Sequence, residues 1–178
     1  MTHLLLAMLA PGSAEAEIGR VQQRIFADHG LVSAIALPPL APVAFLPSEL
    51  PASSLPGFLS RLNASVAAPY RLTFRDARWQ EGWLYLAFDS GGIWESLRAA
   101  ALPETPGLFP AFEGFFLGCG ESEPGLRGRI SPSLPAGGFT SSSLALLRIT
   151  TGDRGSDWWR EVSTETLEER PLRGRRRT

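Results

Sequence analysis

Apolar residues along the chain recur in two spacings, which predict short strands alternating with helices. The apolar run 3–9 has the length and composition of a buried strand. Beyond Pro11-Gly12, apolar residues recur every three or four positions and predict an amphipathic helix. Ser13 stands where an N-cap residue belongs, and Gly30 stands where a helix ends in the left-handed conformation. The chain is therefore expected to open with a strand and a helix.

The same analysis extends to the rest of the chain. It predicts two further helices, one capped by Ser53 or Ser54 and one over 93–101. It predicts strands over 31–37, 43–46, 71–74, 83–88, 112–119, 143–150 and 158–162. The segments 103–110 and 120–138 are rich in proline, glycine and serine and are expected to be loops. This mixture predicts an α+β fold with mostly antiparallel sheets.

Length and composition are those of one folded domain. The chain has 178 residues, of which 44% are hydrophobic and 20% charged, and its net charge is −1. Such a chain buries a sizeable core without a metal or disulfide, and its charge argues against a protein-wide surface for polyanions. We expect a single domain over 1–172, followed by a disordered, arginine-rich tail over 173–178.

The amino terminus and the apolar runs bear on location. The first ten residues lack the basic region of a signal peptide, and no run approaches the roughly 18 apolar residues of a membrane-spanning helix. We therefore expect a cytoplasmic protein without a membrane partner.

Two features of the composition limit the chemistry. All 17 basic residues are arginine, so neither a Schiff base on lysine nor a phosphate-loop lysine is available. Cys119 is the one cysteine, so an intrachain disulfide and a paired-cysteine metal site are excluded, and no metal or cofactor is expected. A nucleophilic cysteine needs a basic partner, and none is evident, so Cys119 is interpreted as a small buried residue.

Four phrases carry a resemblance to a known family. They are His3-Leu4-Leu5-Leu6-Ala7-Met8, Leu37-Pro38-Pro39, Leu84-Tyr85-Leu86-Ala87-Phe88 and Ser143-Leu144-Ala145-Leu146-Leu147-Arg148-Ile149. In their order and spacing, over roughly 2–172, the chain resembles the two-histidine phosphoesterases, which include the bacterial 2′-5′ RNA ligase-like proteins.

The resemblance implies a particular architecture and chemistry. It implies two lobes, each with a mostly antiparallel sheet, that face each other across a central groove with helices on the outside. In that family each lobe presents a His-x-Thr/Ser motif, and the proteins act on 2′,3′-cyclic or 2′-5′ phosphodiester bonds. One imidazole accepts a proton from the attacking oxygen while the other donates one to the leaving oxygen, without a metal.

This chain departs from the family at both motifs. The first motif should follow Leu37-Pro38-Pro39, where Leu40 replaces histidine and Pro42 replaces the hydroxyl residue. The second is best placed at Gly114 and Phe116, within two or three residues. No histidine follows His29, so both motifs are lost in any register. The loss argues against catalysis.

The apolar replacements suggest a binding function. We expect a non-catalytic member of the fold that binds a nucleotide, RNA or a protein partner through an apolar groove. The candidate groove-lining residues are Phe45, Trp83, Phe112, Glu113, Phe115 and Arg148. The alternative is a divergent phosphodiesterase that uses non-histidine residues on cyclic nucleotides or RNA 2′,3′-cyclic ends. The aromatic residues would equally suit the packed core of the sheets, which is the preferred interpretation.

Overall fold

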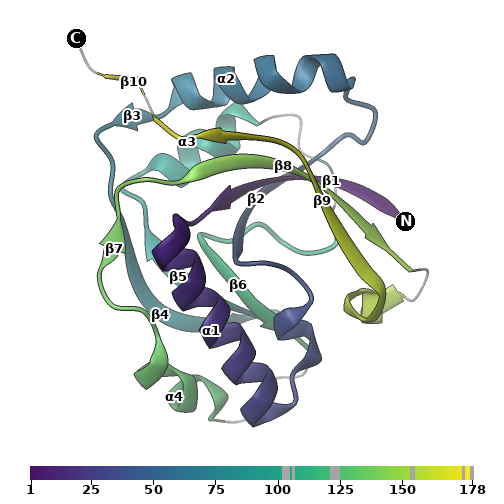
Figure 1. Cartoon of the computed structure of the whole chain (residues 1–178), viewed down its shortest axis with the longest axis vertical. Coiled ribbons are helices and arrows are strands. Elements are labelled where there is room, and N and C mark those ends of the chain that lie inside the picture. The colour runs from purple at the N-terminus through teal and green to yellow at the C-terminus, as the bar shows by residue number, and fades with distance from the viewer. Residues whose placement is uncertain (102–104, 106, 121–124, 153–154, 174, 177–178) are drawn as a thin grey trace.

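The computed structural model of the protein describes residues 1–101, 105, 107–120, 125–152, 155–173 and 175–176 (Figure 1). The α-helices are α1 (Gly12–His29), α2 (Leu55–Ser65), α3 (Ile93–Ala100) and α4 (Leu126–Ile130). The 3₁₀ helices are η1 (Val32–Ile35), η2 (Ala52–Ser54), η3 (Ser131–Ser133) and η4 (Gly155–Glu161). The strands are β1 (Thr2–Leu9), β2 (Leu40–Leu46), β3 (Ala67–Ala68), β4 (Leu72–Gln80), β5 (Trp83–Asp89), β6 (Gly114–Cys119), β7 (Gly138–Phe139), β8 (Ser143–Thr151), β9 (Val162–Pro171) and β10 (Arg175–Arg176).

Two four-stranded sheets organise the molecule. The first has the strand order β2-β1-β8-β9 and the second the order β6-β5-β4-β7. Every pairing within these two sheets is antiparallel. The predicted α+β class with two antiparallel sheets is therefore confirmed.

Each sheet has an inner face turned toward the other sheet and an outer face covered by helices. On β1 the alternation of strand side chains sends Leu5 and Ala7 to the inner face and Leu4 and Leu6 to the outer one. The inner residues share one apolar cluster with Tyr85 of β5 in the second sheet. We call this the inter-sheet cluster. Its position is that of the groove implied by the family resemblance.

Helices α1 and α3 join the two sheets, because each contacts the sheet to which its preceding strand does not belong. Helix α1 follows β1 of the first sheet but contacts β6 of the second. Helix α3 follows β5 of the second sheet but contacts β2 of the first, and α2 lies over β8 and β9 (Figure 1). The two sheets and their helices are thereby interlocked rather than merely adjacent.

Several local predictions differ from the structure. The segment predicted as a strand over 31–37 forms η1, and the one over 158–162 lies mostly in η4, with β9 beginning at its last residue. Helix α1 begins at Gly12 after Pro11, and no side chain caps it, so the prediction of Ser13 as N-cap is wrong. Gly30 does end α1 in the left-handed conformation, with φ of 67°.

The loops and the tail are partly outside the described residues. The predicted loop over 120–138 contains α4 and η3, while 121–124 are not described. Of the predicted tail over 173–178, Arg175 and Arg176 pair in parallel with β3, and 174, 177 and 178 are not described. None of the helices within the described ranges is both long and apolar enough to cross a membrane.

Candidate functional site

The degenerate motif positions lie on the inner faces of the two sheets. Leu40 and Pro42 belong to β2, where Pro42 pairs with the inner residue Ala7 and Leu40 is fully buried in the inter-sheet cluster. Gly114 and Phe116 belong to β6, and Phe116 is likewise fully buried in this cluster. These four positions thus face the space between the sheets.

Gly114 has no room for a side chain. A Cβ atom added there would lie 2.5 Å from Cδ2 of Tyr85 and 2.7 Å from the carbonyl oxygen of Leu86. The carbonyl belongs to the neighbouring strand and cannot rotate away as a side chain could. A histidine at this position would require β5 and β6 to separate.

Aromatic side chains fill the space between the sheets. Phe109 lies between both sheets, with its ring centroid 5.0 Å from that of Phe45 and 5.3 Å from that of Trp83. Trp158 of η4 stacks on Trp83 at 6.1 Å and contacts Phe116 at 6.5 Å. Phe109 and Trp158 are each only 4% exposed. The inner space is therefore a packed core rather than an open groove.

The apolar character of this core limits its chemistry. Tyr85 brings a hydroxyl to its edge, and that hydroxyl donates a hydrogen bond to Oε1 of Gln80 at 3.1 Å. Its ring stacks on Phe112 with a centroid distance of 4.5 Å. Neutral hydrocarbon rings can neither exchange protons nor stabilise a phosphoryl transition state.

A hollow opens at the rim of the inter-sheet cluster. It has a volume of about 770 Å³, and Phe45, Trp83 and Phe109 form its aromatic side. The segment 107–111 forms another side, where Gly107 packs directly on the ring of Phe45. Arg98 of α3 also lines it and contributes a positive charge. We call this surface the aromatic hollow.

The remaining residues that were predicted to line the groove lie on different faces of the two sheets. Phe112 joins the inter-sheet cluster, as do Phe45 and, at its edge, Trp83. Phe115 lies on the opposite face of β6, in the core beneath the helices. Arg148 lies on the opposite face of β8 from the inner residue Leu147, is 47% exposed and forms an ion pair with Glu165. Neither Phe115 nor Arg148 faces the space between the sheets.

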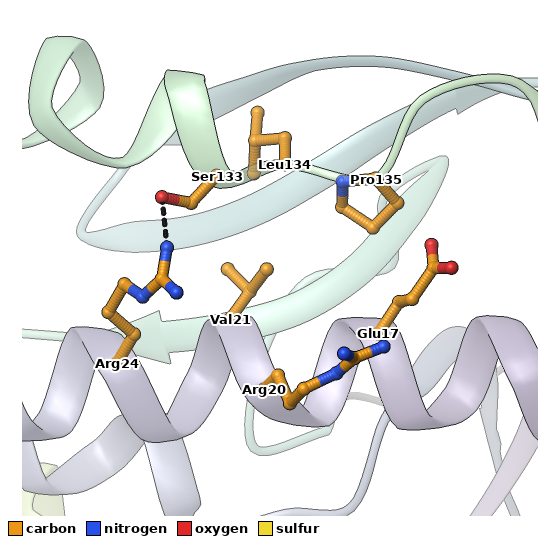
Figure 2. Close-up of a pocket in the computed structure, with 7 residues that line it drawn as sticks. All are labelled: Glu17, Arg20, Val21, Arg24, Ser133, Leu134 and Pro135. Carbon is orange, nitrogen blue, oxygen red and sulfur yellow. Dashed lines mark hydrogen bonds between the residues drawn. The ribbon is translucent and has the colours of Figure 1, made fainter.

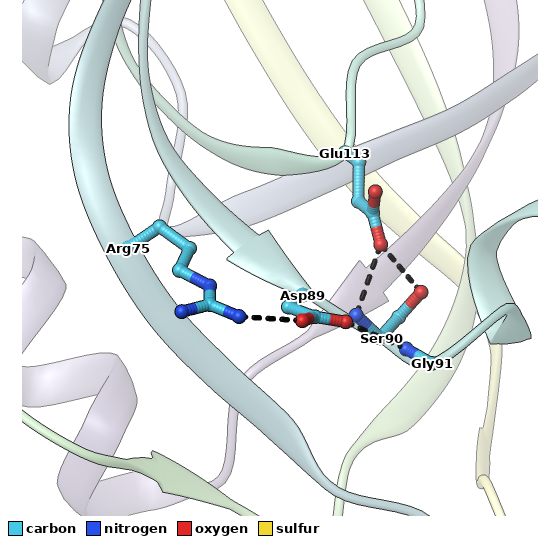
Figure 3. A network of polar contacts seen from close by, with 5 residues as sticks. All are labelled: Arg75, Asp89, Ser90, Gly91 and Glu113. Carbon is cyan, nitrogen blue, oxygen red and sulfur yellow. Dashed lines mark hydrogen bonds and ion pairs between the residues drawn. The ribbon is translucent and has the colours of Figure 1, made fainter.

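Glu113 belongs to a structural network at the start of α3 (Figure 3). Its Oε1 accepts hydrogen bonds from the backbone N–H of Ser90 at 3.0 Å and from the Ser90 hydroxyl at 2.5 Å. The Ser90 oxygen in turn accepts the N–H of Trp94 at 3.1 Å. Through these hydrogen bonds, Glu113 holds the connection between β5 and α3 in place.

Asp89 lies beside this network and pairs with an arginine (Figure 3). Nη2 of Arg75 lies 2.6 Å from Oδ2 of Asp89, and the N–H of Gly91 donates to Oδ1 at 3.0 Å. The hydrogen bond from Arg75 and then that from Gly91 lower the pKa of Asp89 below its usual value. Both partners are more than half exposed, so the pair is a surface contact.

Cys119 ends β6 as a buried residue of the inter-sheet cluster. The Ser33 hydroxyl donates to its carbonyl oxygen, and its own N–H donates to Oγ of Ser33 at 2.8 Å. Burial raises the pKa of the thiol to about 12. A thiol with that pKa is protonated at neutral pH and is a poor nucleophile.

The two histidines lie at separate places in the fold. His3 is near the start of β1, at the opposite end of that strand from the residue that pairs with Leu40. Its ring lies edge-on to Phe45 at 5.9 Å, and its Nε2 is buried with no hydrogen-bond partner in the described part of the chain. His29 is the last residue of α1. The structure does not bring them together as an acid–base pair.

A further hollow, of about 300 Å³, lies between α1 and η3 (Figure 2). The Arg24 guanidinium donates to the Ser133 hydroxyl across it, and Glu17 and Arg20 line the same helix face. It contains none of the predicted site residues. Among the described residues, no group of three or more His, Cys, Asp or Glu side chains is arranged to hold a metal ion.

Some members of the packed core were not found from the sequence. Phe109 lies in a segment expected to be a loop, and the apolar pair Leu108-Phe109 between prolines is the signal that could have marked it. Trp158 was assigned to a strand, although the structure places it in η4.

Comparison with known proteins supports the fold without naming an activity. No protein-family model and no curated protein matches the chain. Among solved structures, the chain is similar to the protein TT0787 of Thermus thermophilus, with a TM-score of 0.55 and 19% sequence identity. The likeness covers 97% of this chain and 98% of that one. It shows a related fold over almost the whole length.

Proposed function

We propose that the chain is a non-catalytic protein of the two-histidine phosphoesterase-like fold. In this proposal it binds a nucleotide, RNA or a protein partner at the aromatic hollow. The observation that carries the proposal is the packing at the motif positions, where Leu40 and Phe116 are fully buried and Gly114 cannot accept a side chain. A phosphodiester cannot enter this space without displacing the core.

The aromatic hollow supports a binding role at the rim instead. Trp83 is half-buried, so part of its ring lies at the surface while the rest packs on Trp158 and Phe109. A ring held in this way is rigid and can stack on a base or on a partner's aromatic side chain at little cost in conformational entropy. Arg98 places a positive charge in the same hollow, which suits a phosphate or a carboxylate.

Nuclear magnetic resonance with adenosine monophosphate as probe tests the proposal on the full chain. The indole N–H signal of Trp83 is expected to shift saturably, and Trp83→Ala is expected to weaken binding at least about tenfold, or 1.4 kcal/mol. Phe26→Ala is the matched control, because Phe26 is 40% exposed on α1 and outside the hollow. Binding that is equal in both variants, or that shifts signals elsewhere only, would place the ligand outside the aromatic hollow.

A further inference from the structure

A third, smaller pocket lies on the outer side of the first sheet, at the end of β1 that carries His3. It has a volume of about 260 Å³ and lies between β1, β8, β9 and the start of α2. Leu4 and Leu55, both buried, and the half-buried Leu50 and Leu167 give it an apolar floor. Ligand pockets commonly range upward from about 300 Å³, so this one fits a small molecule only.

Two opposite charges border the apolar floor. Arg148 of β8 and Glu168 of β9 both line the pocket. In the strand register Arg148 lies opposite Glu165, and Glu168 lies opposite Leu146, two residues before Arg148. The register shifts between Leu146 and Leu147, and both long side chains nevertheless line the same pocket.

Both groups retain hydrogen-bonding capacity in their present contacts. Arg148 bonds Glu165 through Nη1, one of three nitrogens in a guanidinium that carries five N–H donors. Glu168 accepts from Nε of Arg170 through Oε1 at 3.2 Å, and a carboxylate offers about four acceptor sites on two oxygens. The guanidinium can therefore donate to a carboxylate, and the carboxylate can accept from an ammonium.

We propose that this pocket binds a small zwitterion with an aliphatic body, of the class of the branched-chain α-amino acids. Arg148 receives the ligand carboxylate and Glu168 receives its ammonium group. The aliphatic side chain lies on Leu4, Leu50, Leu55 and Leu167, where burial of apolar surface contributes about 25 cal/mol per Å². The opposite charges, which border one apolar floor, match the distribution of charge and hydrocarbon in such a molecule.

The opposed charges also make the pocket selective. A ligand with only a carboxylate leaves Glu168 facing its negative end, and one with only an amine leaves Arg148 facing its positive end. A ligand with a polar side chain would bring groups that are hydrogen-bonded to water into contact with the leucines, which cannot replace those hydrogen bonds. Recognition therefore depends on all three parts of the ligand.

Isothermal titration calorimetry on the full chain tests the proposal with three probes of similar shape: L-leucine, 4-methylpentanoate and isoamylamine. L-leucine is expected to bind saturably, and both single-charge analogues at least about tenfold more weakly. Arg148→Gln and Glu168→Gln are each expected to weaken L-leucine binding at least about tenfold. Arg75→Gln is the control, because it removes a similarly exposed arginine of an ion pair in the other sheet.

Three results would overturn the proposal. They are an absence of saturable L-leucine binding, equal binding of 4-methylpentanoate or isoamylamine, and unchanged binding in both charge variants. Circular dichroism of the variants checks that they fold, which is expected because the side chain of Arg148 is 47% exposed and that of Glu168 is 28% exposed. Because the pocket and the aromatic hollow share no lining residue, failure here leaves the proposed function untouched.

Discussion

The ring of Tyr85 on β5 occupies the space where a side chain at position 114 of β6 would lie. A Cβ atom on Gly114 would approach Cδ2 of that ring to 2.5 Å. Ala87, the strand partner of Gly114, keeps the inner face small at this point, so the Tyr85 ring fills it and stacks on Phe112. The aromatic core can pack in this way because position 114 carries no side chain.

The substitution Gly114→Ala tests this packing. Overpacking a tight core costs about 1–3 kcal/mol, and the nearby carbonyl of Leu86 cannot move without its strand. We therefore expect the variant to lose about that much free energy of unfolding, measured by urea denaturation. Gly12→Ala is the control, because nothing lies within 4 Å of its added Cβ. Equal stability of both variants would mean that β5 and β6 are not held at the distance described.

Burial of Cys119 predicts how its thiol reacts. With its pKa raised to about 12, the thiol of the folded protein stays protonated at pH 8 and is expected to resist iodoacetamide. Unfolding in urea should expose it and restore ordinary thiol reactivity. Mass spectrometry of the alkylated protein measures both rates. Rapid labelling under native conditions would contradict the burial of this residue.

The same pKa shift fixes a direction of stability against pH. The thiol ionises near pH 9 when unfolded and near 12 when folded, so its contribution is complete below pH 9. It is lost as the pH rises from about 9 toward 12, because the unfolded chain releases the proton first. The variant Cys119→Ala is therefore expected to lose less stability than the wild type as the pH rises from about 9 toward 12. Alkaline denaturation of the two proteins measures this difference.

Protonation of His3 is expected to lower the free energy of unfolding at acidic pH. Burial, and then the nearby charge of the amino terminus, lower the pKa of His3 below its usual 6.5. The unfolded chain therefore binds the proton first as the pH falls. The contribution of neutral His3 is complete above pH 6.5 and is lost as the pH falls below that value toward the folded pKa.

Urea denaturation at pH 7.5 and at 5.5 measures this effect. The wild type should lose more stability between these two values than His3→Gln does. The imidazole proton signal of His3 gives an independent check, since its titration midpoint should lie below 6.5. A midpoint at or above 6.5 would contradict the burial of the ring.

The elements that the sequence predicted well are those with local signals. The helix that ends at Gly30 and the hairpin of β4 and β5 rest on periodicity and a glycine turn, and both are present. The start of β2 was missed, because the predicted strand began at Val43 while β2 begins at Leu40 and includes Pro42. This proline is tolerated because β2 is an edge strand, and because the register of β2 shifts next to Pro42.

Other errors have a tertiary cause. The segment over 31–37 has the apolar content of a strand, but the Ser33 hydroxyl exchanges hydrogen bonds with the backbone of Cys119 in β6. That contact holds η1 against the second sheet, and the local sequence carries no sign of it. Phe109 is a similar case, because its burial depends on two sheets meeting around it.

The sequence predicted only part of the candidate site, because the rest depends on tertiary packing. The family resemblance singled out Leu40 and Phe116 as motif positions, and the structure places both side chains in the inter-sheet cluster. Arg148 and Phe115 were misplaced because the direction of a side chain depends on which face of its strand is turned inward. That choice follows from the packing of the helices rather than from the strand itself.

The most direct test of the account is incubation of the purified chain with nucleoside 2′,3′-cyclic monophosphates, followed by chromatography of the products. If the motif positions form a packed core, hydrolysis should proceed no faster than in buffer, and Tyr85→Phe should change nothing. Turnover above the buffer rate that Tyr85→Phe abolishes would contradict the account, because it would show a working site where the structure places an aromatic core.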